Sequence, residues 1–237
     1  MVEKIKTYIE DLDKILDGGI PEKNIILLAG SAGTGKTTLT MQFLCGACSN
    51  MDEKTLFLSL NEQDLKLVEN FKSFSFFNED WINKNKLVLV DVRTAIPADN
   101  PDKSVFKSVD VLNFIYEQLD RYKPKRLVID SISAICKRFD DPDHVRKFLF
   151  DLGNLLLFKG CSAILVSEVE PGARRYSNFG VEEFICDGII YLDHIEKNYR
   201  LRKTLQVVKM RGCKHSEEQF LLDISESGIK LLKLMDH

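Results

Sequence analysis

The sequence predicts an α/β protein with a mostly parallel, twisted sheet, helices on both sides of it, and an antiparallel extension in the C-terminal part. Two observations carry this prediction. Up to residue 167, short apolar segments alternate with segments of helical periodicity, which is typical of βαβ units. After residue 188, four strand-like segments follow one another closely, which favours antiparallel pairing within the same sheet.

The expected parallel strands are five short apolar segments, at residues 25–29, 55–60, 87–92, 126–130 and 163–167. Helices are expected between them at residues 38–48 and 64–74. A third helix follows from apolar residues at i, i+4, i+7, i+11 and i+14, which are Val105, Val109, Leu112, Tyr116 and Leu119. A fourth begins after Asp141, a capping residue followed by Pro142, and ends at Gly160.

The C-terminal strands are expected at residues 188–193, 204–210, 219–224 and 229–234. No linker, repeat or low-complexity segment separates them from the rest, so we predict a single domain over residues 1–237. Hydrophobic residues make up 44% and charged residues 29%, a balance that excludes a disordered or fibrous chain. The apolar runs are far shorter than the roughly 18–20 residues of a membrane span, so we expect none.

The N-terminal residues, the cysteines and the charge distribution indicate the cellular compartment of the chain and the kind of ligand it binds. The first residues show no apolar segment of a secretory signal, and the six cysteines do not form a disulfide framework, so we expect a cytoplasmic protein. The net charge is −3, yet residues 171–214 carry nine basic and five acidic residues. This basic segment indicates either an anionic ligand or an ordinary charged surface.

One motif points to phosphate chemistry. Residues 30–37 match G-x-x-x-x-G-K-[ST] and lie between an expected strand and an expected helix. In this motif, Lys36 reaches the β- and γ-phosphates and the Thr37 hydroxyl binds Mg²⁺, whereas the alternative is a chance glycine-rich turn. The predicted nucleotide-binding residues are Ser31, Ala32, Gly33, Thr34, Gly35, Lys36, Thr37 and Thr38.

A second metal-side group is expected at the end of an apolar strand. Asp130 closes the apolar segment 126–130, and together with the phosphate loop it is predicted to hold Mg²⁺, through water. An aspartate that ends a strand also occurs as a purely structural residue. The expected ligands are therefore ATP and Mg²⁺, with Thr37 and Asp130 on the metal side.

Together with three other segments, these residues resemble the RecA-like ATPases of the KaiC type. The segment 12–21 is similar to the family's lead-in to the phosphate loop, and residues 180–187 are similar to its segment after the fifth strand. Residues 209–215 are similar to its K-x-R-G…H segment. The resemblance spans residues 7–233 and implies a RecA-like P-loop NTPase fold with a single such domain.

The resemblance also implies an assembly. In this family six subunits commonly form a ring with ATP at the interfaces, and the Lys and Arg of the K-x-R segment reach the neighbour's γ-phosphate. Carried over, Lys209 and Arg211 would act in trans, with His215 nearby; the alternative is a solvated strand face. Glu183 and Phe184 stand where some KaiC domains phosphorylate their own Ser and Thr, so we expect no autokinase activity at that position.

The chain departs from the family pattern after its second strand. The family has two adjacent glutamates there, the first of which activates the attacking water, whereas this chain has Asn61 followed by Glu62. Asn61 can position a water molecule but cannot accept its proton. We therefore expect either slow hydrolysis or a reoriented Glu62, and we expect Glu62→Gln to spare nucleotide binding while lowering turnover.

Three weaker signals leave alternatives open. Ser167, at the end of the fifth strand, is either a sensor of the γ-phosphate or an ordinary polar residue. Cys45 and Cys48 form a C-x-x-C pair that is either two buried thiols or a metal or redox pair. Arg174, Arg175 and Tyr176 lie where RecA-type recombinases bind single-stranded DNA, and they are otherwise an exposed loop.

These observations lead to one function hypothesis and two alternatives. The leading hypothesis is a slow, Mg²⁺-dependent ATPase with ATP at the interfaces of a homo-oligomer, such as a hexameric ring, which couples nucleotide state to assembly or to binding of a protein partner. The first alternative is a DNA-linked ATPase of the RadA type, which the acidic pI of about 5.9 does not favour. The second, motivated by Asn61, is an ATP-binding scaffold that does not hydrolyse ATP.

Overall fold

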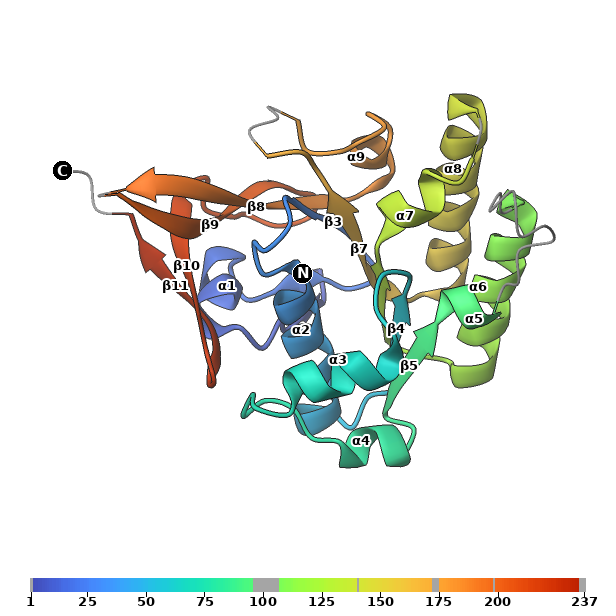
Figure 1. Cartoon of the computed structure of the whole chain (residues 1–237), viewed down its shortest axis with the longest axis horizontal. Coiled ribbons are helices and arrows are strands. Elements are labelled where there is room, and N and C mark those ends of the chain that lie inside the picture. Colours follow the sequence, from blue (N-terminus) through green and yellow to red (C-terminus); the bar gives the residue numbers. More distant parts are fainter. Residues whose placement is uncertain (1, 96–106, 140, 172–174, 198, 235–237) are drawn as a thin grey trace.

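A computed structural model describes residues 2–95, 107–139, 141–171, 175–197 and 199–234. Its centre is a twisted sheet in the order β11-β10-β9-β8-β3-β7-β6-β4-β5, with helices on both faces (Figure 1). The strands are β3 (Ile25–Gly30), β4 (Thr55–Ser59), β5 (Leu87–Asp91), β6 (Arg126–Asp130), β7 (Ser162–Glu168), β8 (Gly188–Lys197), β9 (Arg200–Met210), β10 (Gln219–Ser225) and β11 (Gly228–Lys233). A separate pair, β1 (Lys4–Ile5) and β2 (Ile20–Pro21), lies near the N-terminus. The predicted α/β fold class is confirmed.

The antiparallel part begins one strand later than the sequence predicts. β8 pairs in parallel with β3, and only its other edge is antiparallel, against β9. The reason lies in the connection, because the segment after β7 turns through the short helix α9 (Glu182–Ile185) and returns the chain to the end of the sheet where β3 starts. Asp187 marks this return, since its backbone N–H donates to Ile25 O and its carboxylate accepts from Ile25 N–H.

The remaining helices are α1 (Glu10–Ile15), α2 (Lys36–Asn50), α3 (Asp64–Phe71), α4 (Asp80–Asn83), α5 (Val92–Ala95), α6 (Ser108–Tyr122), α7 (Ile132–Cys136) and α8 (Pro142–Lys159). The predicted helices are confirmed as α2, α3, α6 and α8, although Val105 lies outside the described residues. The carboxylate of Asp141 caps α8 by accepting from Asp143 N–H, and Gly160 ends the helix at a φ of 64°.

Two apolar cores lie on the two faces of the sheet. On β3, Ile26 and Leu28 point into the core beneath α2, whereas Leu27 and Ala29 point into the core beneath α6 and α8. Successive side chains on a strand point to opposite faces, so a strand buried on both faces is apolar at every position. Among the described residues, no helix is both long and apolar enough to cross a membrane.

Candidate nucleotide-binding site

The phosphate loop connects the end of β3 to the start of α2. Gly33 and Gly35 have φ values of 77° and 103°, a region that residues with a side chain rarely adopt. A Cβ added to Gly35 would lie 2.7 Å from Cδ1 of Ile224, so the loop also passes close to β10. Such φ values allow successive backbone N–H groups to turn toward a phosphate, and the N-terminus of the following helix, α2, stabilises the same anion.

Lys36, the first residue of α2, is buried in this loop. Its Nζ donates hydrogen bonds of 2.9 Å to the carbonyl oxygen of Gly30 and 2.8 Å to that of Ser31. Burial lowers the pKa of this lysine, and the carboxylates of Glu168 and Asp130 oppose that effect. A cation held at the loop is the group that a phosphate requires.

The Thr37 hydroxyl donates a 2.9 Å hydrogen bond to Oδ2 of Asp130, the last residue of β6. Burial raises the pKa of Asp130 to about 6, although the Thr37 hydroxyl and Lys36 lower it. A threonine hydroxyl and a carboxylate are the hard oxygen ligands that Mg²⁺ binds, so the donor set fits this ion.

These groups line a cleft of about 470 Å³ at the edge of the sheet where the parallel strands end. Asn61 and Glu62 line this cleft from the turn that follows β4. The Ser59 hydroxyl closes the turn, because its Oγ donates to Glu62 O at 2.6 Å and accepts from Glu62 N–H at 3.1 Å. The Asn61 amide lies 3.4 Å from the Ser131 hydroxyl. The lining residues are Ala32, Gly33, Gly35, Lys36, Thr37, Thr38, Phe57, Ser59, Asn61, Glu62, Leu67, Asp130, Glu168, Lys203 and Ile224.

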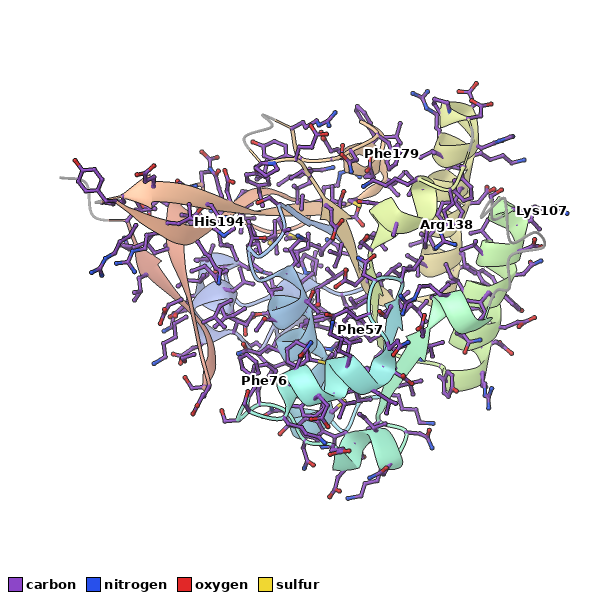
Figure 2. All side chains as sticks on the ribbon, in the orientation of Figure 1. Phe57, Phe76, Lys107, Arg138, Phe179 and His194 are labelled. Carbon is purple, nitrogen blue, oxygen red and sulfur yellow. The ribbon has the colours of Figure 1, made fainter. Side chains whose placement is uncertain are left out.

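Six of these lining residues were not singled out by the sequence, and two of them, Ser59 and Glu168, are the last residues of β4 and β7. Phe57 of β4, near the middle of the molecule in Figure 2, and Leu67 of α3 contribute an apolar wall. Lys203 of β9 and Ile224 of β10 come from the antiparallel part of the sheet. Their apolar and basic character is ordinary for strands, so no local signal distinguishes them.

Two predicted residues of the phosphate loop point into the protein. Ser31 and Thr34 are buried, and Thr34 Oγ1 donates to Ser31 O at 2.8 Å. This bond tightens the turn of the loop. Their backbone groups, rather than their side chains, are therefore what these two residues offer a phosphate.

Lys209 and Arg211 lie at the other end of the sheet. Lys209 Nζ donates to the carbonyl oxygens of Glu183 and Cys186 at 3.1 and 2.7 Å, and Arg211 Nη1 lies 3.5 Å from the Asp187 carboxylate. Asp187 pairs with Ile25, the first residue of β3, whereas the phosphate loop starts at Gly30, the last residue of β3. About 16 Å of strand therefore separates the two cations from the phosphate loop of the same chain. Burial, and next the charge of Arg211, lower the pKa of Lys209.

His215 is partly buried on the loop before β10. Its ring Nδ1 lies 3.1 Å from Ser216 O, and the backbone N–H of Ser216 donates to Ile15 O at the end of α1. Among the described residues, no hydrogen bond or ion pair joins His215 to Lys209 or Arg211. Lys209 and Arg211 lie near one another, since the charge of Arg211 acts on Lys209.

Ser167 is fully buried beside the cleft rather than lining it. Its hydroxyl lies 3.1 Å from that of Ser133, and the next residue, Glu168, reaches the cleft instead. Cys45 and Cys48 are both buried on α2, and burial raises the pKa of both thiols. Among the described residues, no three His, Cys, Asp or Glu side chains gather as metal ligands do.

The loop 170–180 is described only in part, and Arg174 lies outside the described residues. Arg175 lies 3.6 Å from the carboxylate of Glu170, and the Tyr176 ring packs edge-on against Tyr191 at 5.3 Å. Both groups therefore have partners within the chain.

A larger cleft, of about 1120 Å³, lies on the other side of α2. It is lined by α2, the N-terminal segment around Tyr8, and the aromatic residues Phe76, Phe77 and Trp81. It contains neither the phosphate loop nor Asp130, both of which line the smaller cleft.

A phosphate loop between a strand and a helix, an acid at the end of a neighbouring strand and a mostly parallel sheet with helices on both faces define a P-loop NTPase of the RecA-like class. Comparison with known families then places the chain more narrowly. It belongs to the KaiC family of ATPases, whose family model, described as "ATPase: KaiC", matches residues 5–236. It is thus an ATP-binding protein of the RecA superfamily.

The relatives agree with this assignment. The chain is 33% identical to a UPF0273 protein from Thermotoga maritima, over 97% of this chain and 96% of the relative. It is 31% identical to the circadian clock oscillator protein KaiC of Prochlorococcus marinus, over 98% of this chain but 46% of the relative, so it spans about half of that protein. A crystal structure of a KaiC-like protein from Pyrococcus horikoshii is similar with a TM-score of 0.85 and 33% identity, covering 98% of this chain and 99% of the other.

Proposed function

We propose that this protein binds Mg²⁺ and ATP in the cleft at the phosphate loop and hydrolyses the ATP slowly. The observation that carries the proposal is the hydrogen bond between Thr37 and Asp130 beside the buried Lys36. The loop backbone at 31–38 and Lys36 would bind the phosphates, and Thr37 with Asp130 would hold Mg²⁺, which supplies charge neutralisation at the phosphates. Lys203 and Ile224 would border the nucleotide on the side of β9 and β10.

We further propose that the site is completed by a second copy of the chain in a ring such as a hexamer. Lys209 and Arg211 lie about 16 Å of strand away from their own phosphate loop, so these cations serve a γ-phosphate only if it is bound by a neighbour. The Arg211 side chain is 58% exposed, so it is available to a neighbouring subunit. Because one nucleotide would then touch two subunits, its hydrolysis would alter their association or the binding of a partner.

Mixing two inactive variants tests this proposal. Lys36→Ala removes the phosphate contact and Arg211→Ala removes the trans cation, so each variant alone is expected to lose phosphate release. In a mixed assembly, an Arg211→Ala subunit supplies an intact phosphate loop and a Lys36→Ala subunit supplies Arg211, so some interfaces are complete. Turnover in the mixture is expected to rise well above the sum of the separate variants.

Two controls accompany the mixture. Arg200→Ala removes an exposed arginine at the start of β9, at the opposite end of that strand from Lys209 and Arg211. This variant is expected to keep wild-type turnover. The second control mixes a chain that carries both substitutions with Arg211→Ala. No subunit in this mixture has Arg211, so no interface is complete and the mixture is expected to stay inactive. A mixture no more active than its components, or a wild-type protein that remains monomeric with Mg²⁺ and ATP, contradicts the shared site.

A scaffold that binds ATP without hydrolysing it is the second candidate. It is favoured by Asn61, whose side chain lies against Ser131 where the family has a glutamate. Steady-state phosphate release separates the two candidates. Release by the wild type that equals release by Lys36→Ala supports the scaffold.

A further inference from the structure

We propose that Glu168 accepts the proton of the attacking water in the phosphate cleft and supplies the carboxylate that Asn61 lacks. The inference rests on the proposed function, because it assigns a residue to ATP hydrolysis. A neutral amide does not accept a proton at ordinary pH, so another group in the cleft must do so if hydrolysis uses a general base.

Among the described residues, three carboxylates line the cleft, those of Glu62, Asp130 and Glu168. Asp130 accepts the hydrogen bond from the Thr37 hydroxyl and belongs to the metal side. Glu62 and Glu168 therefore remain as proton acceptors.

Glu168 is firmly positioned by its backbone. It lies directly opposite Gly30 in the pairing of β7 with β3, where the phosphate loop begins. The hydroxyl of Ser133 accepts from its backbone N–H at 2.9 Å, and its carbonyl oxygen accepts from the side chain of Asn178 at 2.6 Å. The next N–H, that of Val169, donates to Gly30 O, the same oxygen that accepts from Lys36.

The carboxylate of Glu168, in contrast, is uncommitted. Within the described part of the chain it has no hydrogen bond and no ion pair, although it lies on the wall of the cleft. A fixed backbone with a free carboxylate is what a general base requires, because the group must be positioned but not already satisfied.

Electrostatics supports Glu168 over Glu62. Burial lowers the pKa of Lys36, and the carboxylate of Glu168 opposes this more strongly than that of Asp130 does. Glu168 is thus the free carboxylate of the cleft whose charge acts on Lys36, the lysine that meets the outer phosphates in this motif.

The chemical step is balanced without any further reactant. The oxygen of water forms a bond to the γ-phosphorus while the bond from that phosphorus to the β–γ bridging oxygen breaks. The bridging oxygen leaves on ADP with its electron pair. Glu168 takes one proton from the water and passes it to solvent as phosphate departs, which regenerates the carboxylate.

The test compares Glu168→Gln with Glu62→Gln in two measurements. Equilibrium binding of a fluorescent ATP analogue with Mg²⁺ is expected to be at least as tight for Glu168→Gln as for wild type, because a negative charge beside the phosphates is gone. Single-turnover phosphate release by Glu168→Gln is expected to fall by about 10²–10⁴-fold, the usual value of a general base. Glu62→Gln is expected to lose less.

Chemical rescue separates a proton acceptor from a residue that only holds the loop. Formate added to Glu168→Ala is expected to restore part of the phosphate release, because a small carboxylate can occupy the space. Glu170→Gln is the matched control, since its side chain is 80% exposed two residues further on, and it is expected to behave as wild type.

The outcomes distinguish the two proposals. Wild-type release by Glu168→Gln, or weaker nucleotide binding with no formate rescue, overturns the role of Glu168 and leaves the proposed function standing. A wild-type protein that binds no nucleotide, or that releases no more phosphate than Lys36→Ala, overturns both.

Discussion

Thr37 and Asp130 are 93 residues apart in the chain, yet the threonine hydroxyl donates a 2.9 Å hydrogen bond to the aspartate carboxylate. The bond joins the first turn of α2 to the end of β6. It therefore links the side of the site that would bind phosphates to the side that would hold the metal ion.

Replacing Thr37 by valine is expected to destabilise the protein without nucleotide. The carboxylate of Asp130 is buried and loses a donor, which costs about 1–3 kcal/mol in the free energy of unfolding. Urea unfolding in EDTA measures the loss. Thr38→Val is the control, because the described structure shows no hydrogen bond from that side chain, and equal losses for the two variants would show that the bond to Asp130 contributes nothing.

Lys36→Ala is expected to abolish tight nucleotide binding. A charged hydrogen bond contributes about 1.5–3 kcal/mol, so the affinity for ATP should fall by at least roughly tenfold. Calorimetric titration with Mg²⁺ and ATP measures the change, with Lys66→Ala on the exposed side of α3 as the control. Unchanged affinity would mean that phosphates bind elsewhere on this chain.

Gly46 and Gly153 are expected to respond in opposite ways to alanine. A Cβ on Gly46 would lie 2.2–2.5 Å from atoms of Tyr8, which packs against α2, so Gly46→Ala should destabilise by about 1–3 kcal/mol. A Cβ on Gly153, inside α8, would meet nothing closer than 4.0 Å, so Gly153→Ala should stabilise by about 0.5–1 kcal/mol. Urea unfolding of both variants measures this; shifts of the same sign contradict the packing argument.

The cysteines are expected to differ sharply in reactivity. Five are buried and Cys213 is partly exposed, and the thiolate is the reactive form of a cysteine. Burial raises the pKa of the Cys161 thiol to about 12 and raises those of Cys136 and Cys186 as well. Iodoacetamide at pH 8, followed by peptide mass spectrometry, should label Cys213 first and all six only after denaturation. Rapid labelling of Cys161 in the native protein would contradict this burial.

The raised pKa of the Cys161 thiol also predicts that the protein becomes less stable to unfolding at alkaline pH. The folded-state pKa of Cys161 lies above the value of 9.0 for a free thiol, so the stability that this thiol contributes is fully present below about pH 9. It is lost as the pH rises toward 12, because the unfolded chain releases the proton first. Urea unfolding between pH 8 and pH 11 should show a smaller decline for Cys161→Ala than for wild type.

Much of the fold and the phosphate side of the site could be predicted from local sequence. The glycines and Lys36 of the phosphate loop, the apolar run before Asp130, and the cap at Asp141 are all encoded within a few residues. Such local patterns predict backbone conformation and burial well, because both depend mainly on residues that are adjacent in the sequence. Helices of four to six residues such as α1, α4 and α7 are too short to show a period, so they were not predicted.

The other wall of the cleft could not be predicted, because it is formed where strands distant in the sequence pair in the sheet. Glu168 reaches the phosphate loop because β7 pairs with β3, and Lys203 and Ile224 reach it because β9 and β10 extend the same sheet. The parallel pairing of β8 likewise followed from the return of the chain at Asp187. Strand order arises from the simultaneous burial of both faces of the sheet, a property of the whole chain that no short segment records.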